Sequence, residues 1–184
     1  MSKQNASSPI RSMNSNEKRR FFAEYERLIL SESEPSIELK TCLNVWEEIQ
    51  KMPYKLTVFN DVRPVLKILR EQGLILAVIT NMNTTGPEIL DKLELTGHID
   101  FAITSLEAKA EKPDPRIFEM AFNKAKCEPM ENIHVGDQVL SDINGAKQIG
   151  THYILIDRYS RNEAFTDGPK ITSLFQLPGL INRI

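Results

Sequence analysis

The first third of the chain carries apolar residues at the spacing of amphipathic helices. Two segments, 17–30 and 36–50, have this pattern, and Pro35 interrupts the chain between them. Their aromatic residues, among them Phe22 and Trp46, are most simply packing faces. The pattern therefore predicts a pair of antiparallel helices.

From residue 61 onward, predicted helices alternate with short apolar runs. The helices are expected at 61–73, 86–97, 114–126, 141–150 and 171–181, and the strands at 74–79, 101–104, 132–136 and 152–157. The run LILAVI at 74–79 is apolar throughout, which is typical of a strand buried on both faces of a parallel sheet. The alternation predicts an α/β fold, a Rossmann-like parallel sheet with helices on both faces.

Capping residues mark the ends of several of these helices. Asn60 or Asp61 is placed to cap the helix 61–73, and Gly73 is placed to end it. Asp114 and Pro115 suit the start of the helix 114–126.

Composition and charge exclude several classes of protein. The chain has 184 residues, of which 41% are hydrophobic and 26% charged, which suits one globular domain with a small appendage. A net charge of −2 does not indicate a nucleic-acid partner. No apolar run approaches the roughly 18 residues of a membrane-spanning helix. Cys42 and Cys127 lie far apart in sequence and fit reduced thiols, which favours a cytoplasmic location.

The first sixteen residues are polar and rich in serine and asparagine. They lack the apolar segment of a secretory signal, and we interpret them as a disordered lead-in. A transit peptide is the alternative, because the segment is basic and has no acidic residue before Glu17. The predicted organisation is thus a lead-in at 1–16, a helical segment at 17–55 and an α/β core at 56–184.

Polar side chains follow the predicted strands. In parallel sheets, ligands bind beyond the carboxyl ends of the strands, so these residues are expected to meet at one edge. They are Thr80 and Asn81, Thr104 and Ser105 with the loop that carries Lys112, Asp137 and Asp142, and Asp157 and Arg158.

Most of these residues also have a simple structural interpretation. Thr80 could cap the next helix, Lys112 could be an ordinary solvated lysine, and Asp142 could be favoured by a helix dipole. Within its apolar strand, His134 is better interpreted as a hydrogen-bonded core residue than as a ligand. Asp137 follows a buried strand directly, and a buried carboxylate requires a partner such as Mg²⁺.

Three features follow one another along the chain: Thr80, the segment EKPDPRIF with Lys112, and the segment GDQVLSD with Asp137 and Asp142. In this order they resemble the motifs of the haloacid dehalogenase superfamily of phosphohydrolases. The chain looks most like the subgroup with a helical cap inserted after the first core strand. The resemblance covers residues 17–181, with 17–55 as a partial cap. It implies that Thr80, with Asn81 beside it, contacts the transferring phosphoryl group and that Lys112 neutralises charge. It also implies that Asp137 and Asp142 bind Mg²⁺.

One part of the family pattern is absent. The family's nucleophile is the first aspartate of an Asp-x-Asp motif that ends the first, central strand, before the cap. This sequence has no aspartate before Asp61 and no Asp-x-Asp anywhere. We therefore expect an N-terminally truncated core whose two half-sheets pair directly or leave unpaired edges. Asp61 is interpreted as a helix cap rather than a substitute nucleophile.

The sequence supports two main hypotheses about function. The first is descent from a Mg²⁺-dependent phosphatase of a small phosphorylated metabolite, in a chain that is inactive alone. The alternative is a non-catalytic binding or regulatory remnant that docks a partner or the missing segment. A receiver-type phosphoacceptor domain is disfavoured because Asp137 follows Lys112, and no dinucleotide or P-loop motif occurs. The sequence leaves the substrate and the oligomeric state open.

Overall fold

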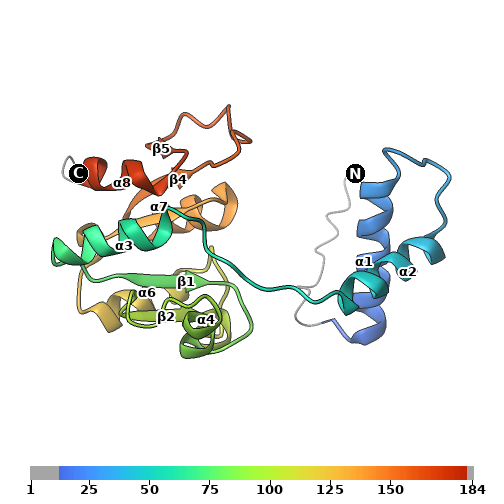
Figure 1. Ribbon diagram of the computed structural model, residues 1–184, viewed down its shortest axis with the longest axis horizontal. Helices are drawn as coiled ribbons and strands as arrows, with labels where there is room; N and C mark the ends of the chain where they lie inside the picture. The colour runs from blue at the N-terminus through green and yellow to red at the C-terminus, as the bar shows by residue number, and fades with distance from the viewer. Residues whose placement is uncertain (1–12, 182–184) are drawn as a thin grey trace. The chain divides into compact units, whose positions relative to one another are not determined.

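The computed structural model describes residues 13–181 and divides between Lys55 and Leu56 into two units (Figure 1). The first unit contains α1 (Ser15–Leu30) and α2 (Leu39–Lys51). Asn14 caps α1, accepting hydrogen bonds from the N–H groups of Asn16 and Glu17 at 2.9 and 3.0 Å. The predicted lead-in lies outside the described residues up to residue 12, and Ser15 and Asn16 belong to α1.

The two helices of the first unit pack through aromatic side chains, which confirms the predicted helix pair. The ring of Phe22 stacks on that of Trp46 with 5.3 Å between centroids. Cys42 is fully buried in this unit, and both cysteines are free thiols.

The second unit alternates helices and strands as the sequence predicts. Its elements are α3 (Val62–Glu71), β1 (Ala77–Thr80), α4 (Gly86–Lys92), β2 (Phe101–Thr104), α5 (Ser105–Ala108), α6 (Pro115–Ala125), β3 (Ile133–Gly136), α7 (Asn144–Ile149), β4 (His152–Ile156), β5 (Lys170–Ile171) and α8 (Leu177–Ile181). A turn of π-helix at Val139–Ile143 joins β3 to α7. Within residues 13–181, no helix has the length and apolar character needed to cross a bilayer.

The prediction of one helix over 171–181 was wrong. Ile171 is buried and pairs in β5 beside β4, and α8 begins only at Leu177. Between them, the carboxamide of Gln176 accepts hydrogen bonds from the N–H groups of Thr172 and Ser173. These bonds stabilise a turn where a helix was predicted. The pairing of Ile171 with β4 outweighs the helical pattern of the segment.

The strands form two parallel sheets, β1–β2 and β3–β4–β5, instead of one. Among the described residues, no ladder of hydrogen bonds joins β1 to β3, so the expectation of unpaired edges, not direct pairing, is the one that holds. The run 74–79 is not buried on both faces as predicted. Leu74 is 39% and Ile75 59% exposed, and both precede β1, which begins only at Ala77 and has a neighbouring strand on one side only.

Helices cover both faces of the sheets, as expected. Consecutive residues of β2 point into different cores: Ala102 joins the cluster that contains Val65 and Leu69 of α3. Ile103 joins the cluster that contains Phe118 of α6. Since side chains alternate along a strand, α3 and α6 lie on opposite faces. This is the layered α/β architecture that the pattern predicts.

Candidate functional site

The candidate site lies where β1 and β3 end. Thr80 is the last residue of β1 and is half-buried. It does not cap the next helix, because Thr85 occupies the N-cap position of α4 and donates its N–H to Glu88 at 3.0 Å. Thr80 therefore stands at the carboxyl edge of the sheet, where ligands of parallel sheets bind.

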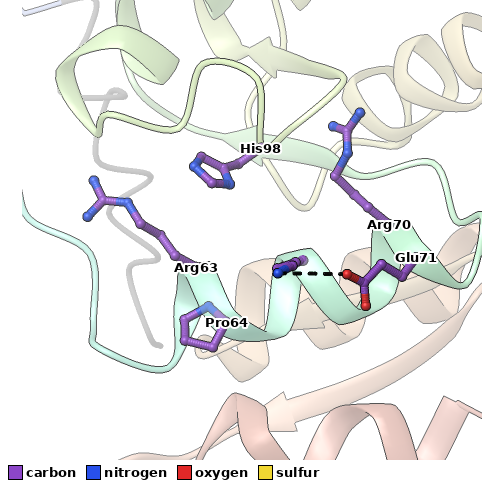
Figure 2. Close-up of a pocket in the computed structure, with 6 residues that line it drawn as sticks. Arg63, Pro64, Arg70, Glu71 and His98 are labelled. Carbon is purple, nitrogen blue, oxygen red and sulfur yellow. Dashed lines mark ion pairs between the residues drawn. The ribbon is translucent and has the colours of Figure 1, made fainter.

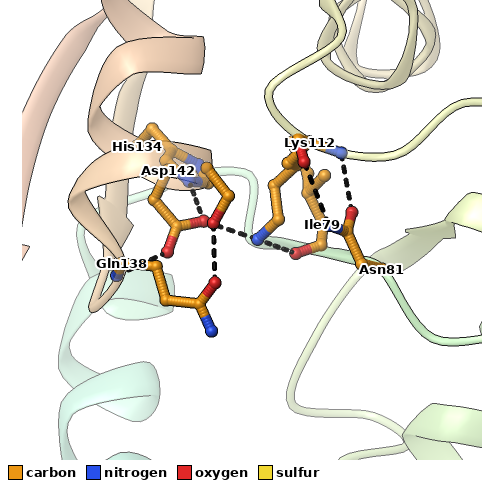
Figure 3. Close-up of polar contacts among 7 residues, drawn as sticks. Ile79, Asn81, Lys112, His134, Gln138 and Asp142 are labelled. Carbon is orange, nitrogen blue, oxygen red and sulfur yellow. Dashed lines mark hydrogen bonds and ion pairs between the residues drawn. The ribbon is translucent and has the colours of Figure 1, made fainter. Parts of the chain in front are cut away.

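Lys112 connects the carboxyl ends of the two sheets (Figure 3). Its Nζ donates to the carbonyl oxygen of Ile79 at 2.9 Å and to Oδ1 of Asp142 at 2.6 Å. The side chain is only 13% exposed. Lys112 is therefore a buried, paired cation and not a solvated lysine.

Asn81 holds the backbone of Lys112. Its Oδ1 accepts the N–H of Lys112 at 2.7 Å, and its Nδ2 donates to the carbonyl oxygen of the same residue at 3.1 Å. The reciprocal pair is visible in Figure 3. Asn81 thus fixes the loop from which the lysine side chain reaches the sheet edge.

Asp142 is the most enclosed carboxylate of the site, at 3% exposure. Oδ1 accepts from Lys112 and from Nε2 of His134 at 3.2 Å, and Oδ2 accepts the N–H of Gln138 at 3.0 Å. Burial raises the pKa of Asp142, but the His134 bond, the charge and hydrogen bond of Lys112 and the Gln138 N–H outweigh it and leave this pKa well below its ordinary value. Asp142 is therefore ionised, and because an ionised carboxylate only accepts, Nε2 of His134 carries the hydrogen of this bond.

Gly136, the last residue of β3, makes room for Asp142. A Cβ at this position would lie 2.3 Å from Cβ and Cγ of Asp142. The absence of a side chain at Gly136 is therefore what permits the close approach of this carboxylate.

His134 is a hydrogen-bonded core residue, as predicted. Besides its bond to Asp142, it packs edge-on against Phe118 with ring centroids 5.1 Å apart. Sequence reasoning did not connect His134 or the Gln138 N–H with Asp142. The available signal was that His134 lies two residues before Gly136, so that both face the same side of the strand, the side on which Asp142 lies against Gly136.

Asp137 is exposed, so the argument that its burial demands a partner was wrong. It directly follows Gly136 at the end of β3. Its position at the sheet edge remains compatible with a ligand role.

The metal-binding capacity of the site rests on two carboxylates. Within residues 13–181, no group of three or more His, Cys, Asp or Glu side chains is placed to hold a metal ion. Mg²⁺ commonly takes one or two protein carboxylates and completes its shell with water and phosphate oxygens. Asp137 and Asp142 meet that number, but Asp142 must release an oxygen from Lys112 or His134 first.

The two other aspartates near the edge are occupied. Asp157 follows β4 and accepts the N–H groups of Arg161 and Asn162 at 2.9 and 2.8 Å. Asp61 stands at the N-cap position of α3, but its side chain makes no cap bond, which contradicts its interpretation as a helix cap. It binds Arg158 through two hydrogen bonds of 2.7 and 2.9 Å.

Apart from the sheet edge, a depression lies on the outer side of α3 and is lined by three cationic side chains (Figure 2). Each cation has an acidic partner. The pairs are Arg63 with Glu94 at 3.0 Å, Lys67 with Glu71 at 3.9 Å and Arg70 with Asp100 at 3.4 Å. This surface is balanced in charge and exposed, and it does not compete with the sheet edge as a candidate site.

Comparison with known proteins adds an independent view. A family model described as haloacid dehalogenase-like hydrolase matches residues 3–156. The mouse haloacid dehalogenase-like hydrolase domain-containing protein 3 is 39% identical over 104 residues, 56% of this chain and 41% of that protein. Ribulose-1,5-bisphosphate 5-phosphatase of Halopiger xanaduensis is 32% identical over 111 residues, 60% of this chain and 46% of that protein.

A solved structure supports the same fold. The crystal structure of a HAD phosphatase from Thermococcus onnurineus matches with a TM-score of 0.66 at 22% identity and covers 88% of each chain. At this identity the likeness shows the fold alone. The chain spans about two fifths of the length of the first curated relatives, with 41%, 39% and 39% of each covered.

Proposed function

The chain belongs to the haloacid dehalogenase-like hydrolases, and we propose that its site binds the phosphoryl group of a small phosphorylated metabolite. The observation that carries the proposal is the buried ammonium of Lys112 at the carboxyl edge of both sheets. The phosphatase name of the Halopiger relative supports phosphate as the ligand class. A net charge of −2 disfavours a nucleic acid.

The side chains have distinct roles in this proposal. Lys112 places a positive charge against the phosphoryl oxygens, a charge-assisted contact of the stronger kind. Thr80 supplies a hydroxyl donor from the end of β1. Asn81 positions Lys112 through its two backbone bonds.

Mg²⁺ is the cofactor that suits this arrangement, and Asp137 and Asp142 are the residues that would hold it. When bound, the ion neutralises charge on the phosphoryl oxygens. Because Asp142 already accepts from Lys112, we expect binding of metal and of phosphate to be linked: phosphate draws the ammonium away and removes one of the two donors to Oδ1.

We further propose that the chain binds its ligand without turning it over. The sequence contains no Asp-x-Asp and no aspartate before Asp61. The carboxylates of Asp61, Asp142 and Asp157 each accept several hydrogen bonds, which makes them less reactive as nucleophiles. The free thiols of Cys42 and Cys127 support a reducing compartment, and we propose the cytoplasm.

Binding is tested by calorimetric titration of inorganic phosphate into the protein with and without MgCl₂. We expect saturable binding that Mg²⁺ strengthens. Lys112→Met is expected to weaken it at least tenfold, whereas Lys67→Met, which removes the same charge from an exposed site, should change it less than twofold. Circular dichroism verifies that each variant is folded. Equal affinity of the Lys112→Met and wild-type proteins would contradict the proposal.

The role of the metal is tested with Asp137→Asn, an exposed substitution that should leave folding intact. It is expected to abolish the strengthening by Mg²⁺ while leaving metal-free phosphate binding unchanged.

Turnover is tested with p-nitrophenyl phosphate in MgCl₂, and no hydrolysis above buffer is expected. Hydrolysis that survives Asp61→Asn but is lost in Asp137→Asn would refute the claim that the nucleophile is absent.

A further inference from the structure

The loop that joins β4 to β5 begins at the sheet edge that carries the candidate site (Figure 1). β3 and β4 are parallel neighbours with Gly136 opposite Leu155, so the residues that follow the two strands leave the sheet at the same edge. Neighbouring strands lie about 5 Å apart. The first part of this loop, residues 157–162, therefore starts one strand away from Asp137. We call it the β4 loop.

Hydrogen bonds hold the backbone of the β4 loop in place. The buried carboxylate of Asp157 accepts the N–H groups of Arg161 and Asn162 at 2.9 and 2.8 Å. The carbonyl oxygen of Asn162 accepts a hydrogen bond from Nζ of Lys170 at 2.9 Å. The side chains of the β4 loop therefore start from a fixed backbone.

The β4 loop carries two arginines, and their charges are treated differently. Arg158 donates to both carboxylate oxygens of Asp61, and its side chain is 17% exposed. Arg161 is exposed, and within residues 13–181 its guanidinium forms no ion pair. It lies 5.2 Å from the ring centroid of Tyr159, a contact that orients a cation without neutralising it. The β4 loop thus presents one positive charge that no carboxylate balances.

Arg161 and Asp137 line the same cavity. This cavity lies between β1 and β3, has a volume of about 1010 Å³, and is bordered at its carboxyl end by Asp137 and the β4 loop. In the part of the chain that the structure describes, Asp137 also forms no ion pair. One end of the cavity therefore combines an exposed carboxylate, which suits a cation, with an exposed guanidinium, which suits an anion.

The position of Arg161 differs from that of Lys112. Lys112 connects the end of β1 to Asp142, whereas Arg161 follows β4, the next strand beyond β3. A phosphoryl group held at Lys112 leaves Arg161 to another part of the same ligand. The guanidinium offers paired N–H donors that match the two oxygens of a carboxylate or phosphate.

We propose that Arg161 binds a second anionic group of the phosphorylated metabolite, a carboxylate or a second phosphate, and so selects doubly anionic ligands over singly anionic ones. In this arrangement Asp157 positions the backbone of Arg161, and the Tyr159 ring supports the guanidinium. The inference rests on the proposed function, because Lys112 holds the phosphoryl group of the same ligand.

The test is calorimetric titration of the protein with 3-phosphoglycerate and with glycerol 3-phosphate, without Mg²⁺. The two compounds are similar in size, and the first carries a carboxylate where the second has a hydroxymethyl group. In about 0.15 M NaCl, which screens long-range attraction, we expect the doubly anionic compound to bind about tenfold more tightly. Fructose 1,6-bisphosphate and fructose 6-phosphate form the corresponding pair for a second phosphate. The pair with the larger preference identifies which anionic group Arg161 binds.

Variants of Arg161 separate its role from that of net charge. Arg161→Met is expected to abolish the preference while changing the affinity for glycerol 3-phosphate less than twofold. Arg161→Lys keeps the charge but not the paired donors, so it should restore only part of the preference. Arg70→Met is the matched control, because it removes an exposed guanidinium of α3 that pairs with Asp100, and it should leave the preference unchanged. Circular dichroism verifies that each variant is folded.

The proposal would be overturned by equal affinity of the wild-type protein for both members of each pair, or by a preference that survives Arg161→Met. A variant that weakens all four compounds equally would also overturn it, since that result reports net charge alone. Inorganic phosphate separates the two claims. If phosphate binds and the preference is missing, only the role of Arg161 fails. If neither phosphate nor any of the four compounds binds, the proposed function itself fails.

Discussion

Asp61 and Arg158 form a buried ion pair whose contribution to stability is measurable. Asp61 is 1% exposed and also accepts hydrogen bonds from the Ser173 hydroxyl at 2.6 Å and the Leu174 N–H at 2.9 Å. The bond from Arg158, with these two donors, outweighs burial and lowers the pKa of Asp61 from 3.8 to about 2. Each pKa unit corresponds to about 1.4 kcal/mol, so the ionised form of Asp61 stabilises the fold by about 2 kcal/mol.

We expect Asp61→Asn to lower the free energy of unfolding at pH 7 by about 2–4 kcal/mol, because it also leaves the Arg158 guanidinium without its counter-ion. The melting temperature should fall on the order of 10 °C. The folded pKa is the lower one, so the stabilisation is complete above the unfolded pKa near 3.8 and is lost as the pH falls through about 2. The deficit of the variant should therefore shrink between pH 4 and pH 2.

The assay is urea unfolding followed by far-UV circular dichroism at several pH values. Fluorescence is unsuitable because the single tryptophan, Trp46, lies in the other unit. Glu71→Gln is the matched control: its partner Lys67 lies 3.9 Å away and both side chains are exposed, so the change should stay within about 0.5 kcal/mol. A variant as stable as this control, or a deficit that is the same at pH 7 and pH 2, would refute the reasoning.

Two further predictions concern close packing. Gly136→Ala places a Cβ 2.3 Å from Asp142 and should weaken phosphate binding at least tenfold in the calorimetric titration. Gly179→Ala, whose Cβ would have no atom within 4 Å, should leave phosphate binding unchanged. Equal effects of the two variants would contradict the contact assigned to Gly136. In folded protein, iodoacetamide should alkylate the half-buried Cys127 well before the fully buried Cys42, as measured by peptide mass spectrometry, and simultaneous labelling would show that the α1–α2 unit opens.

The helices and strands were largely predictable because their signals are local. The alternation from residue 61 predicts the α/β order, and the cap at Asp114, which accepts the N–H of Arg116 at 3.0 Å, lies where the sequence indicates. Segment 171–181 was wrong because its pairing partner is β4, distant in sequence. Hydrophobic periodicity carries no information about which strand a segment will join.

The candidate site divides in the same way. Thr80, Lys112 and Asp142 were predicted as site residues from the sequence because their order and spacing resemble a family, and the comparisons confirm the family. The exposure of Asp137 and the contact of His134 with Asp142 were not found, since both depend on how the chain turns after β3.

The sequence by itself determined the parallel α/β class, from the period and order of its apolar runs, and the residue types at the sheet edge. It determined the family through the resemblance of its ordered motifs, which the family model bears out. Only the tertiary structure decided that Lys112 is a buried cation between two sheets, that Asp61 binds Arg158 and that β1 and β3 leave a cavity between them. The physical reason is that burial, ion pairing and strand pairing are set by partners distant in sequence, which no local pattern specifies.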